Sequence, residues 1–191
     1  MTSDIIEILF DGDADGLERY LATGGDANAE HEGNPLLTLA CSLALDYPRM
    51  VEVLVEHGAD VNRRGRKGQI PLVTTSYLGA ASTVALLLKA GARVNEADED
   101  IGQTAFMAAA KGGHVEIMKQ LVAHGAKAAL KDKHGDTALH WSATEHDHPD
   151  VARYLLSLGL DPNEKNASGR TAKDYARALK FSDMLKVMEQ A

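Results

Sequence analysis

The sequence has one cysteine, few aromatic residues and no excess of basic charge. Because Cys41 has no second cysteine to pair with, an intrachain disulfide and a CxxC metal or redox motif are both excluded. Aromatic side chains make up 5% of the residues, so the core must be built from Ala, Leu, Val, Ile and Met. A net charge of −8 argues against a nucleic-acid-binding protein, which needs a dominant basic face.

Long apolar segments are also missing. No apolar run approaches the ~20 residues that a membrane-spanning helix needs. The N-terminus has neither the basic segment nor the apolar segment of a signal peptide. Together with the single cysteine, these features predict a cytoplasmic protein that does not bind a membrane.

The motifs of common catalytic and nucleotide-binding sites are absent as well. The sequence contains no P-loop, GxGxxG, GxSxG or HExxH motif and no kinase motif set. No serine or cysteine has an obvious histidine and acidic partner. We therefore expect no catalytic residues and no cofactor.

What the sequence does contain is a repeat of two markers with one period. The first marker is a short segment that begins with glycine, at intervals of 34, 33, 34 and 34 residues: Gly24–Asn28, Gly58–Asn62, Gly91–Asn95, Gly125–Ala129 and Gly159–Asn163. The second marker keeps the same phase: Asn34–Leu37, Ile70–Val73, Thr104–Met107, Thr137–His140 and Thr171–Asp174. Two independent markers on one period indicate a structural repeat.

Each repeat is predicted to be a pair of short helices. Pro or Ala after Thr or Asn is typical of a capped helix start, and glycine after an apolar helix is typical of a left-handed helix end. In the fourth unit, two apolar-periodic stretches over residues 104–111 and 114–124 are separated by Gly112 and Gly113. Each unit therefore consists of a helix, a tight turn, a second helix and a polar connection.

This pattern resembles the ankyrin repeat, whose signature combines Thr-Pro-Leu-His, Gly-His and Gly-Ala-Asp-Val-Asn. Thr137–His140, Gly113–His114 and Gly58–Asn62 match it. The resemblance covers nearly the whole chain and implies an all-α solenoid of helix pairs with short hairpin-like loops. It divides residues 1–191, a single domain, into an N-terminal cap (1–28), four internal repeats (29–62, 63–95, 96–129 and 130–163) and a C-terminal cap (164–191).

The departures from the pattern fall between the expected helices, where insertions cost little. The loop at Ala29–Asn34 is short, and extra residues lie around Leu43–Pro48. The connection Glu96–Gln103 is one residue longer than its neighbours, and one extra residue lies near His146. We expect these changes to alter the hairpins locally and not the fold.

The resemblance implies a monomeric, non-catalytic protein-binding module: an adaptor, inhibitor, effector or immunity-type protein. Its partner would bind the concave face, which loop tips and exposed ends of the inner helices form. Carried over to this sequence, the candidate partner-binding residues are Phe10, Arg66, Lys67, Tyr77, Leu78, Lys111, Lys133 and His134. Cys41 and Ser42 occupy the corresponding helix end of the second unit.

Charge singles out the third unit. Residues 63–95 carry six basic residues and no acidic one, and the loop that follows contains Glu96, Asp98, Glu99 and Asp100. The basic loop could pair with this neighbouring acidic loop, or it could bind a partner that has an acidic patch. A nuclear-import or nucleic-acid patch fits less well, because the surrounding charge is acidic.

Four further features have two interpretations each. Glu145–His148 could bind zinc or nickel, or could be a polar turn; metal binding is the alternative to a protein-binding role. His140 would tie a helix start to neighbouring backbone, with catalysis as the lesser alternative. Trp141 is expected in the core, with a binding role as the alternative. Cys41 is expected to be a small buried side chain and not a reactive thiol.

Overall fold

A computed structural model describes residues 2–43 and 47–191. Its helices come in consecutive pairs, which confirms the predicted all-α repeat architecture. The first helices of the pairs form an inner row: α1 (Thr2–Asp11), α3 (Leu36–Ser42), α5 (Pro71–Leu78), α7 (Ala105–Gly112), α9 (Ala138–Ser142) and α11 (Ala172–Leu179). The second helices form an outer row: α2 (Ala14–Ala22), α4 (Pro48–Glu56), α6 (Ala81–Lys89), α8 (Val115–Ala123), α10 (Pro149–Ser157) and α12 (Ser182–Glu189).

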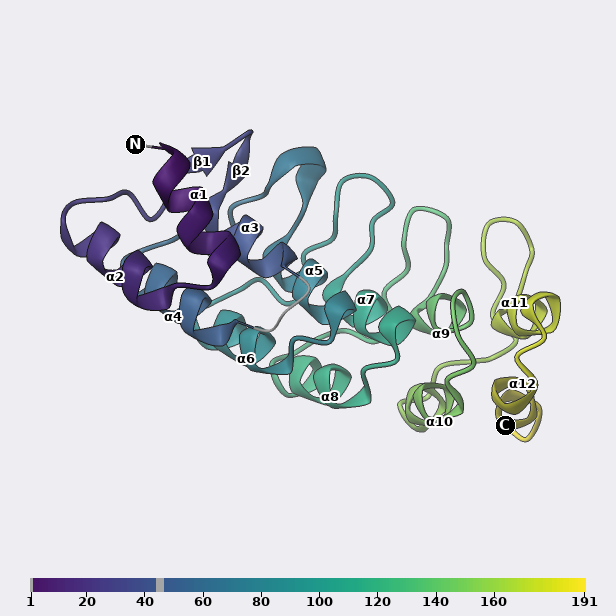
Figure 1. The fold of residues 1–191 in the computed structure, drawn as a ribbon. Coiled ribbons are helices and arrows are strands. Elements are labelled where there is room, and N and C mark those ends of the chain that lie inside the picture. The colour runs from purple at the N-terminus through teal and green to yellow at the C-terminus, as the bar shows by residue number, and fades with distance from the viewer. Residues whose placement is uncertain (1, 44–46) are drawn as a thin grey trace.

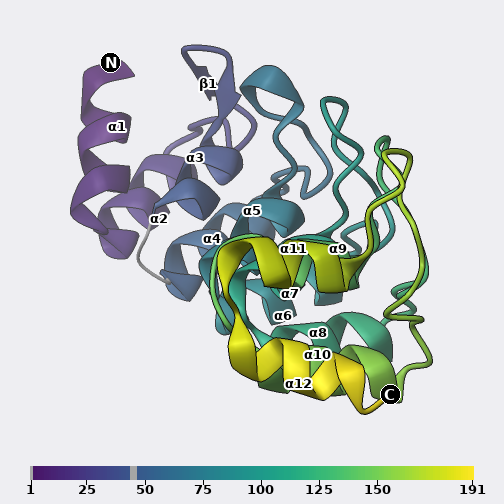
Figure 2. The ribbon, with the colours of Figure 1, turned by 90° about the vertical axis from the view of Figure 1, so that its right-hand side faces the viewer.

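The pairs stack side by side into an elongated array with the two termini at opposite ends (Figure 1). The connections between pairs project as a row of loops from one side of the array, and the end-on view shows them rising away from both helix rows (Figure 2). The loop at residues 29–34, predicted to be short, lies in the hairpin of β1 (Glu30–His31) and β2 (Asn34–Pro35), in which Glu30 is opposite Pro35. The loop of the third unit contains the 3-10 turn η1 (Arg66–Gly68). The predicted insertion at Leu43–Pro48 includes residues 44–46, which lie outside the described residues.

Threonine side chains cap the starts of the inner helices α7 and α11. The hydroxyl of Thr104 accepts a hydrogen bond from the Met107 amide at 3.4 Å. At α11 the bonds are reciprocal: the Thr171 hydroxyl accepts from the Asp174 amide at 3.2 Å, and Asp174 accepts from the Thr171 amide at 2.9 Å. These bonds satisfy amides that a helix start otherwise leaves unpaired.

His140 ties the start of α9 to the next unit, as predicted from its place in the Thr-x-x-His tetrapeptide. The Thr137 amide donates to Nδ1 of His140 at 3.2 Å, and Nε2 lies 3.1 Å from the carbonyl oxygen of Arg170. Because Nδ1 accepts a hydrogen bond, the ring proton is on Nε2, which donates to Arg170. The side chain is 1% exposed.

The hydrophobic core runs without interruption from Ile5 at one end to Met188 at the other. In α7, the three consecutive residues Ala108, Ala109 and Ala110 are fully buried between α5 and α9. Because alanine has no atom beyond Cβ, the inner helices can pack closely and leave room for larger side chains from the outer row. Among the described residues, no helix is both long enough and apolar enough to cross a membrane.

Backbone hydrogen bonds join neighbouring loop tips. The Lys133 amide donates to the carbonyl of Ile101 at 2.9 Å, and one unit further the Ala167 amide donates to the carbonyl of His134 at the same distance. Gly102 adopts φ +79°, and a Cβ there would lie 3.1 Å from the Lys133 nitrogen. Glycine is therefore required at this position both for its conformation and for the close approach of the next loop.

Candidate functional site

Three polar side chains at the same position of successive units form a row across the ends of the inner helices. Tyr77 lies in the last turn of α5, Lys111 in the last turn of α7, and Glu145 just beyond α9. The Lys111 ammonium lies 2.9 Å from Oε1 of Glu145, and the Tyr77 hydroxyl donates to Oε2 of Glu145 at 3.0 Å. We call these three residues the 77–111–145 row.

Trp141 of α9 flanks this row. The Lys111 ammonium lies 5.0 Å from the ring centre of Tyr77 and 5.4 Å from that of Trp141, within the range of cation–π attraction. The Trp141 indole N–H donates to Oδ2 of Asp132 at 3.0 Å. Trp141 is therefore half-buried, packed on the core along one side and presented beside Lys111 along the other. The expectation of a core tryptophan holds only in part.

The contacts of the row shift two pKa values. A hydrogen bond to the Glu145 carboxylate, then burial, raises the pKa of Tyr77 above 10.0. Burial alone would raise the pKa of Glu145, but the hydrogen bonds from Lys111 and Tyr77 outweigh it and lower that pKa below 4.5. At neutral pH the row therefore consists of a neutral phenol, a carboxylate and an ammonium, and the two charges cancel.

Histidine rings brace the ends of the same inner helices. Nε2 of His114 lies 3.0 Å from the carbonyl oxygen of Tyr77, and the ring packs over Gly79, where a Cβ would come within 2.6 Å of it. The His148 ring covers Gly113 one unit further, where a Cβ would come within 2.5 Å of it. The backbone below the row is thereby held in place.

The third unit also carries exposed cations. Arg66 and Lys67 lie in η1 at the loop tip, and both are exposed. The Arg66 amide donates to the Asn34 side chain at 2.9 Å, and Lys67 adopts φ +58°. Neither side chain has an ion-pair partner among residues 2–43 and 47–191.

The other two arginines of this loop are paired. Arg64 lies 2.6 Å from Glu96 and 3.7 Å from Glu99, and Arg63 bonds to Glu30 of the preceding hairpin. Intramolecular pairing therefore accounts for Arg63 and Arg64 but not for Arg66 and Lys67. Asp98 does not serve as their partner, because its carboxylate accepts four backbone amides of its own loop.

A small hollow connects the basic tip to the helix. It has a volume of about 210 Å³ and is lined by Lys67, Val73, Thr74 and neighbouring loop residues. Tyr77 and Leu78 follow Val73 and Thr74 by four residues, so they lie on the same face of α5. Tyr77 and Leu78 are each 38% exposed. Four of the predicted site residues are thus exposed on one unit, and we call them the strip of the third unit: Arg66, Lys67, Tyr77 and Leu78.

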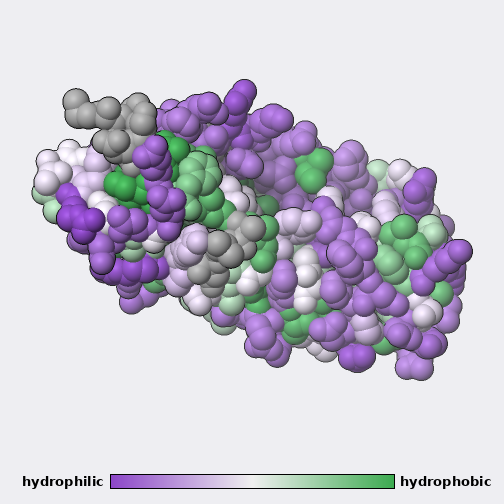
Figure 3. All heavy atoms as spheres, viewed as in Figure 1, coloured by the Kyte–Doolittle hydropathy of each residue, from purple (hydrophilic) through white to green (hydrophobic). Residues whose placement is uncertain are grey.

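The remaining predicted residues are distributed along the array. Phe10 of α1 is 61% exposed. Figure 3 shows hydrophobic side chains on the surface of the N-terminal part of the array. Lys133 and His134 are exposed at the loop tip of the fifth unit, where the Lys133 ammonium bonds to the carbonyl of Glu99. Lys111 is engaged in the row and is not a free cation.

Cys41 differs from its expected place at an exposed helix end. The side chain is 3% exposed, and burial raises the pKa of its thiol to about 12. Ser42 is the exposed residue of the pair. Cys41 is therefore a buried apolar side chain, as its apolar neighbours predicted, and an unreactive one at neutral pH.

The Glu145–His148 turn does not converge on one point. Glu145 belongs to the row, while the two carboxylate oxygens of Asp147 accept the amides of Asp183 and Met184 at the start of α12. The His146 and His148 rings are 5.6 Å apart. In the part of the chain that the structure describes, no three His, Cys, Asp or Glu side chains are grouped to hold a metal ion.

Glu145 and Trp141 belong to this surface, although neither is among the predicted partner-binding residues. The pattern groups Glu145 with the histidines that follow it, and Trp141 with the core. The sequence does contain a signal for the row. Tyr77, Lys111 and Glu145 are spaced by one repeat length, and they are an aromatic, a basic and an acidic residue, which can contact one another favourably. Side chains at one position of adjacent units lie close enough to touch.

The comparisons with known proteins agree on one family. A model of ankyrin repeats in three copies matches residues 75–166, and a single-repeat model of the same family matches residues 32–66. The crystal structure of EF0377, an ankyrin repeat protein, superimposes with a TM-score of 0.84 at 24% identity and covers 100% of this chain and 98% of that one.

Curated relatives are similar over most of this chain. Ankyrin repeat protein YahD of Escherichia coli is 26% identical over 183 residues, which are 93% of this chain and 90% of that protein. Ankyrin repeat protein FPV031 of fowlpox virus is 27% identical over 161 residues, or 81% of this chain. The chain spans about half of the fowlpox protein, 47%, and smaller fractions of several other relatives, such as 21% of the mitochondrial disaggregase of Bos taurus.

Proposed function

Because the chain belongs to the ankyrin repeat family, whose repeats are protein–protein interaction modules, we propose that it binds a partner protein through the strip of its third unit. The observation that carries the proposal is the composition of that strip. Two exposed cations without ion-pair partners in the described part of the chain lie at one end, and Tyr77 and Leu78 lie at the other. The partner presents an acidic patch to Arg66 and Lys67 and an apolar contact to Leu78.

The aromatic and apolar end of the strip is suited to act as the anchor. Tyrosine and arginine are enriched among the residues that carry most of an interface's binding energy. Tyr77 is held by Glu145 and by the His114 contact to its carbonyl, so little side-chain freedom is lost when a partner packs on it. The 77–111–145 row therefore works as a rigid platform beside the strip.

The cations supply a different contribution. Charges at a solvent-exposed rim chiefly raise the association rate and select partners of opposite charge, and salt screens both effects. The chain as a whole has a net charge of −8, so the basic tip is a local exception on an acidic molecule. It would orient an acidic partner toward the third unit. We propose further that the protein is a monomeric cytoplasmic binder without catalytic activity.

A charge-reversal pair tests the proposal. In the variant R66E/K67E, capture of partner proteins from the native cell should fall about tenfold or more, while the melting temperature stays nearly unchanged, because exposed charges contribute little to folding. The matched control is K89E/R153E, which reverses two exposed cations on the outer row. It changes the net charge equally and should leave capture intact.

Two outcomes would count against the strip. If both double variants reduce capture equally, the effect is one of net charge and not of this site. If R66E/K67E lowers the melting temperature and leaves capture unaffected, the cations stabilise the fold. Size-exclusion chromatography with light scattering tests the monomeric state.

A further inference from the structure

Asparagine side chains link successive units along the bases of the loops. Asn28 donates from Nδ2 to the carbonyl of Gly58 at 2.9 Å and accepts the amide of Asp60 at 2.9 Å. Asn62 does the same with Gly91, at 3.2 Å, and Arg93, at 2.8 Å. We call each such carboxamide, with the carbonyl and the amide that it bridges, a rung.

The third rung repeats this geometry. Asn95 donates to the carbonyl of Gly125 at 2.9 Å and accepts the amide of Lys127 at 2.8 Å. In each rung the carbonyl that accepts the hydrogen bond belongs to a glycine with φ between +85° and +89°. The amide that donates to the asparagine belongs to the residue two positions after that glycine. One planar carboxamide thus satisfies an acceptor and a donor that the turn holds side by side.

The series is interrupted at the fifth unit, where Ala129 occupies the asparagine position. The receiving turn is unchanged, because Gly159 has φ +85° and Asp161 follows it at the same spacing. Neither the carbonyl of Gly159 nor the amide of Asp161 has a hydrogen-bond partner among the residues that the structure describes. The donor and acceptor of a rung are present here without the carboxamide.

A hollow of about 640 Å³ lies at this turn. Its walls are formed on one side by Lys127, Ala128 and Ala129 and on the other by Leu158, Gly159, Leu160, Asp161 and Glu164. Leu158 is 37% exposed, so an apolar surface adjoins the unpaired backbone groups. The volume is in the range of pockets that hold small ligands or a few residues of a peptide.

We infer that this hollow binds the side-chain carboxamide of an asparagine in an extended segment of another protein. The carboxamide takes the place that Asn28, Asn62 and Asn95 show in the other rungs. An apolar neighbour of that asparagine packs on Leu158. The site is separate from the strip of the third unit and shares no residue with it, so it can be present whether or not that strip binds a partner.

The polar groups of the hollow select this chemistry. A carboxylate only accepts and would meet the Gly159 carbonyl, whereas an ammonium only donates and leaves the Asp161 amide unpaired. The Asp161 carboxylate is turned toward Asn163, whose amide it accepts at 2.8 Å. Glu164 is paired with Lys131 at 2.6 Å, so its charge is balanced. Lys127 also lines the hollow and attracts a carboxylate, but only a group with one donor and one acceptor satisfies both the Gly159 carbonyl and the Asp161 amide.

The test uses nuclear magnetic resonance on the ¹⁵N-labelled protein. The probe is the peptide acetyl-Ala-Asn-Leu-N-methylamide, with peptides carrying Ala or Asp in place of its Asn as controls. The Asn peptide should shift the amide signal of Asp161 saturably, with an affinity on the order of millimolar, and leave those of Asp60 and Arg93, which lie outside the hollow, in place. No saturable shift at Asp161, or an equal shift with the Ala peptide, overturns the inference.

Two variants of this chain sharpen the test. In A129N the protein supplies its own carboxamide, and binding at Asp161 should weaken about tenfold or more. In N62A the second rung loses its carboxamide, and a new peptide-dependent shift should arise at Arg93. Retained binding in A129N overturns the site, as does a folded N62A protein without a shift at Arg93.

Amide hydrogen exchange gives a readout without any peptide. In the wild-type protein the Asp161 amide should exchange about tenfold or more faster than the bonded amides of Asp60 and Lys127, and A129N should remove that difference. Slow exchange at Asp161 in the wild-type protein would mean that its amide is already bonded, and the inference would fail.

Discussion

The Tyr77 hydroxyl donates a hydrogen bond to Glu145 at 3.0 Å across 68 residues of sequence, which is two repeats of the array. Contacts in repeat proteins ordinarily join only adjacent units. Here the intervening unit contributes Lys111, which contacts both partners. The 77–111–145 row therefore couples the third unit to the fifth as well as to the fourth.

A double-mutant cycle should detect this coupling. Tyr77→Phe removes only the hydroxyl, and Glu145→Ala removes the carboxylate that accepts its hydrogen bond. Because the groups are partly exposed, we expect a coupling free energy of about 0.5–1 kcal/mol from urea unfolding. The matched pair Tyr77→Phe with Glu116→Ala, which lie on different helices, should give additive effects. Additivity in the first cycle as well would show that the bond does not contribute in solution.

The stabilisation by Glu145 should depend on pH in one direction. Its pKa in the folded protein is below the ordinary value of 4.5, because Lys111 and Tyr77 bind the charged form. A carboxylate with a lowered pKa stabilises the folded state above its unfolded pKa, and this contribution is lost as the pH falls through the folded value. The difference in unfolding free energy between wild type and Glu145→Gln should be constant from pH 7 to about 5 and shrink below 4.5.

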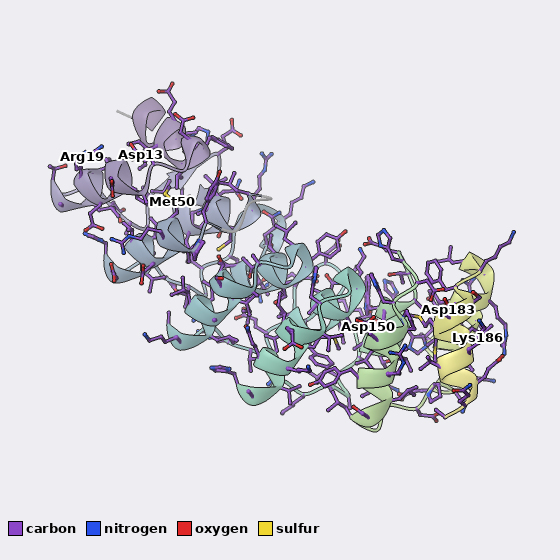
Figure 4. All side chains as sticks on the ribbon, turned by 60° about the horizontal axis from the view of Figure 1, so that its bottom comes forward. Asp13, Arg19, Met50, Asp150, Asp183 and Lys186 are labelled. Carbon is purple, nitrogen blue, oxygen red and sulfur yellow. The ribbon has the colours of Figure 1, made fainter. Side chains whose placement is uncertain are left out.

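Urea titrations at several pH values between about 7 and about 3.5 would measure that difference. Asp150→Asn, on the exposed side of α10 (Figure 4), is the control for the loss of one carboxylate outside the row. The interpretation is wrong if the gap between wild type and Glu145→Gln widens on acidification.

Two glycines in the left-handed backbone region, Gly125 and Gly113, allow the cost of an added methyl group to be compared with and without a steric clash. Gly125 has φ +89°, and a methyl group added at its Cα would have no other atom within 4 Å. Gly125→Ala should therefore incur only the conformational cost, about 1–2 kcal/mol. Gly113 has φ +83°, but there the methyl would lie 2.5 Å from the His148 ring. Gly113→Ala should destabilise more, by about 1 kcal/mol or more beyond Gly125→Ala.

Removing the ring should remove the excess. In the background His148→Ala, the cost of Gly113→Ala is expected to fall to that of Gly125→Ala, measured as melting temperature or urea midpoint. An excess that persists without the ring would show that its source is the backbone and not the packing of His148.

Much of the fold could be predicted, because the repeat markers are themselves structural. Glycine and the Thr-x-x-His tetrapeptide mark turns and caps whose geometry depends on nearby residues alone. The expected helices of the fourth unit, 104–111 and 114–124, correspond to α7 (Ala105–Gly112) and α8 (Val115–Ala123). That His140 ties a helix start to neighbouring backbone was expected from the family resemblance, whereas its second partner, the carbonyl of Arg170 in the next unit, comes from the structure.

The surface was less predictable, because it depends on contacts between units. The helix-end position predicts exposure of both Cys41 and Ser42, yet the stack buries Cys41. Charge composition alone does not separate Arg64, which pairs with Glu96, from Arg66, which is exposed and has no ion-pair partner among the described residues. Asp98 accepts hydrogen bonds from backbone amides of its own loop. This depends on the conformation of the loop, which a count of charges does not reveal.

The two ends of the array differ from the internal units in what covers them. At the C-terminal end, α12 packs on α10, and Met184 and Met188 are fully buried. The other side of α12 is polar: Asp183 and Lys186 form an exposed ion pair at 2.9 Å (Figure 4). These contacts support the prediction that residues 164–191 act as a cap, which covers an apolar face and presents a polar one.

Deleting residues 164–191 should therefore expose Val151 and Leu155 of α10, both fully buried in the complete chain. We expect the shortened protein to melt at a lower temperature and to self-associate, because an uncovered apolar face of this kind attracts a second copy. Light scattering after size-exclusion chromatography would detect the association. A milder variant, Met184→Ala with Met188→Ala, keeps the polar side of α12 and should lower stability by about 2–5 kcal/mol per site at most while the protein stays monomeric. The contacts of α11 with α9 and of α12 with α10 indicate that these two helices cover the apolar face of the fifth unit. If the shortened protein remains monomeric with an unchanged melting curve, α11 and α12 do not cap the array.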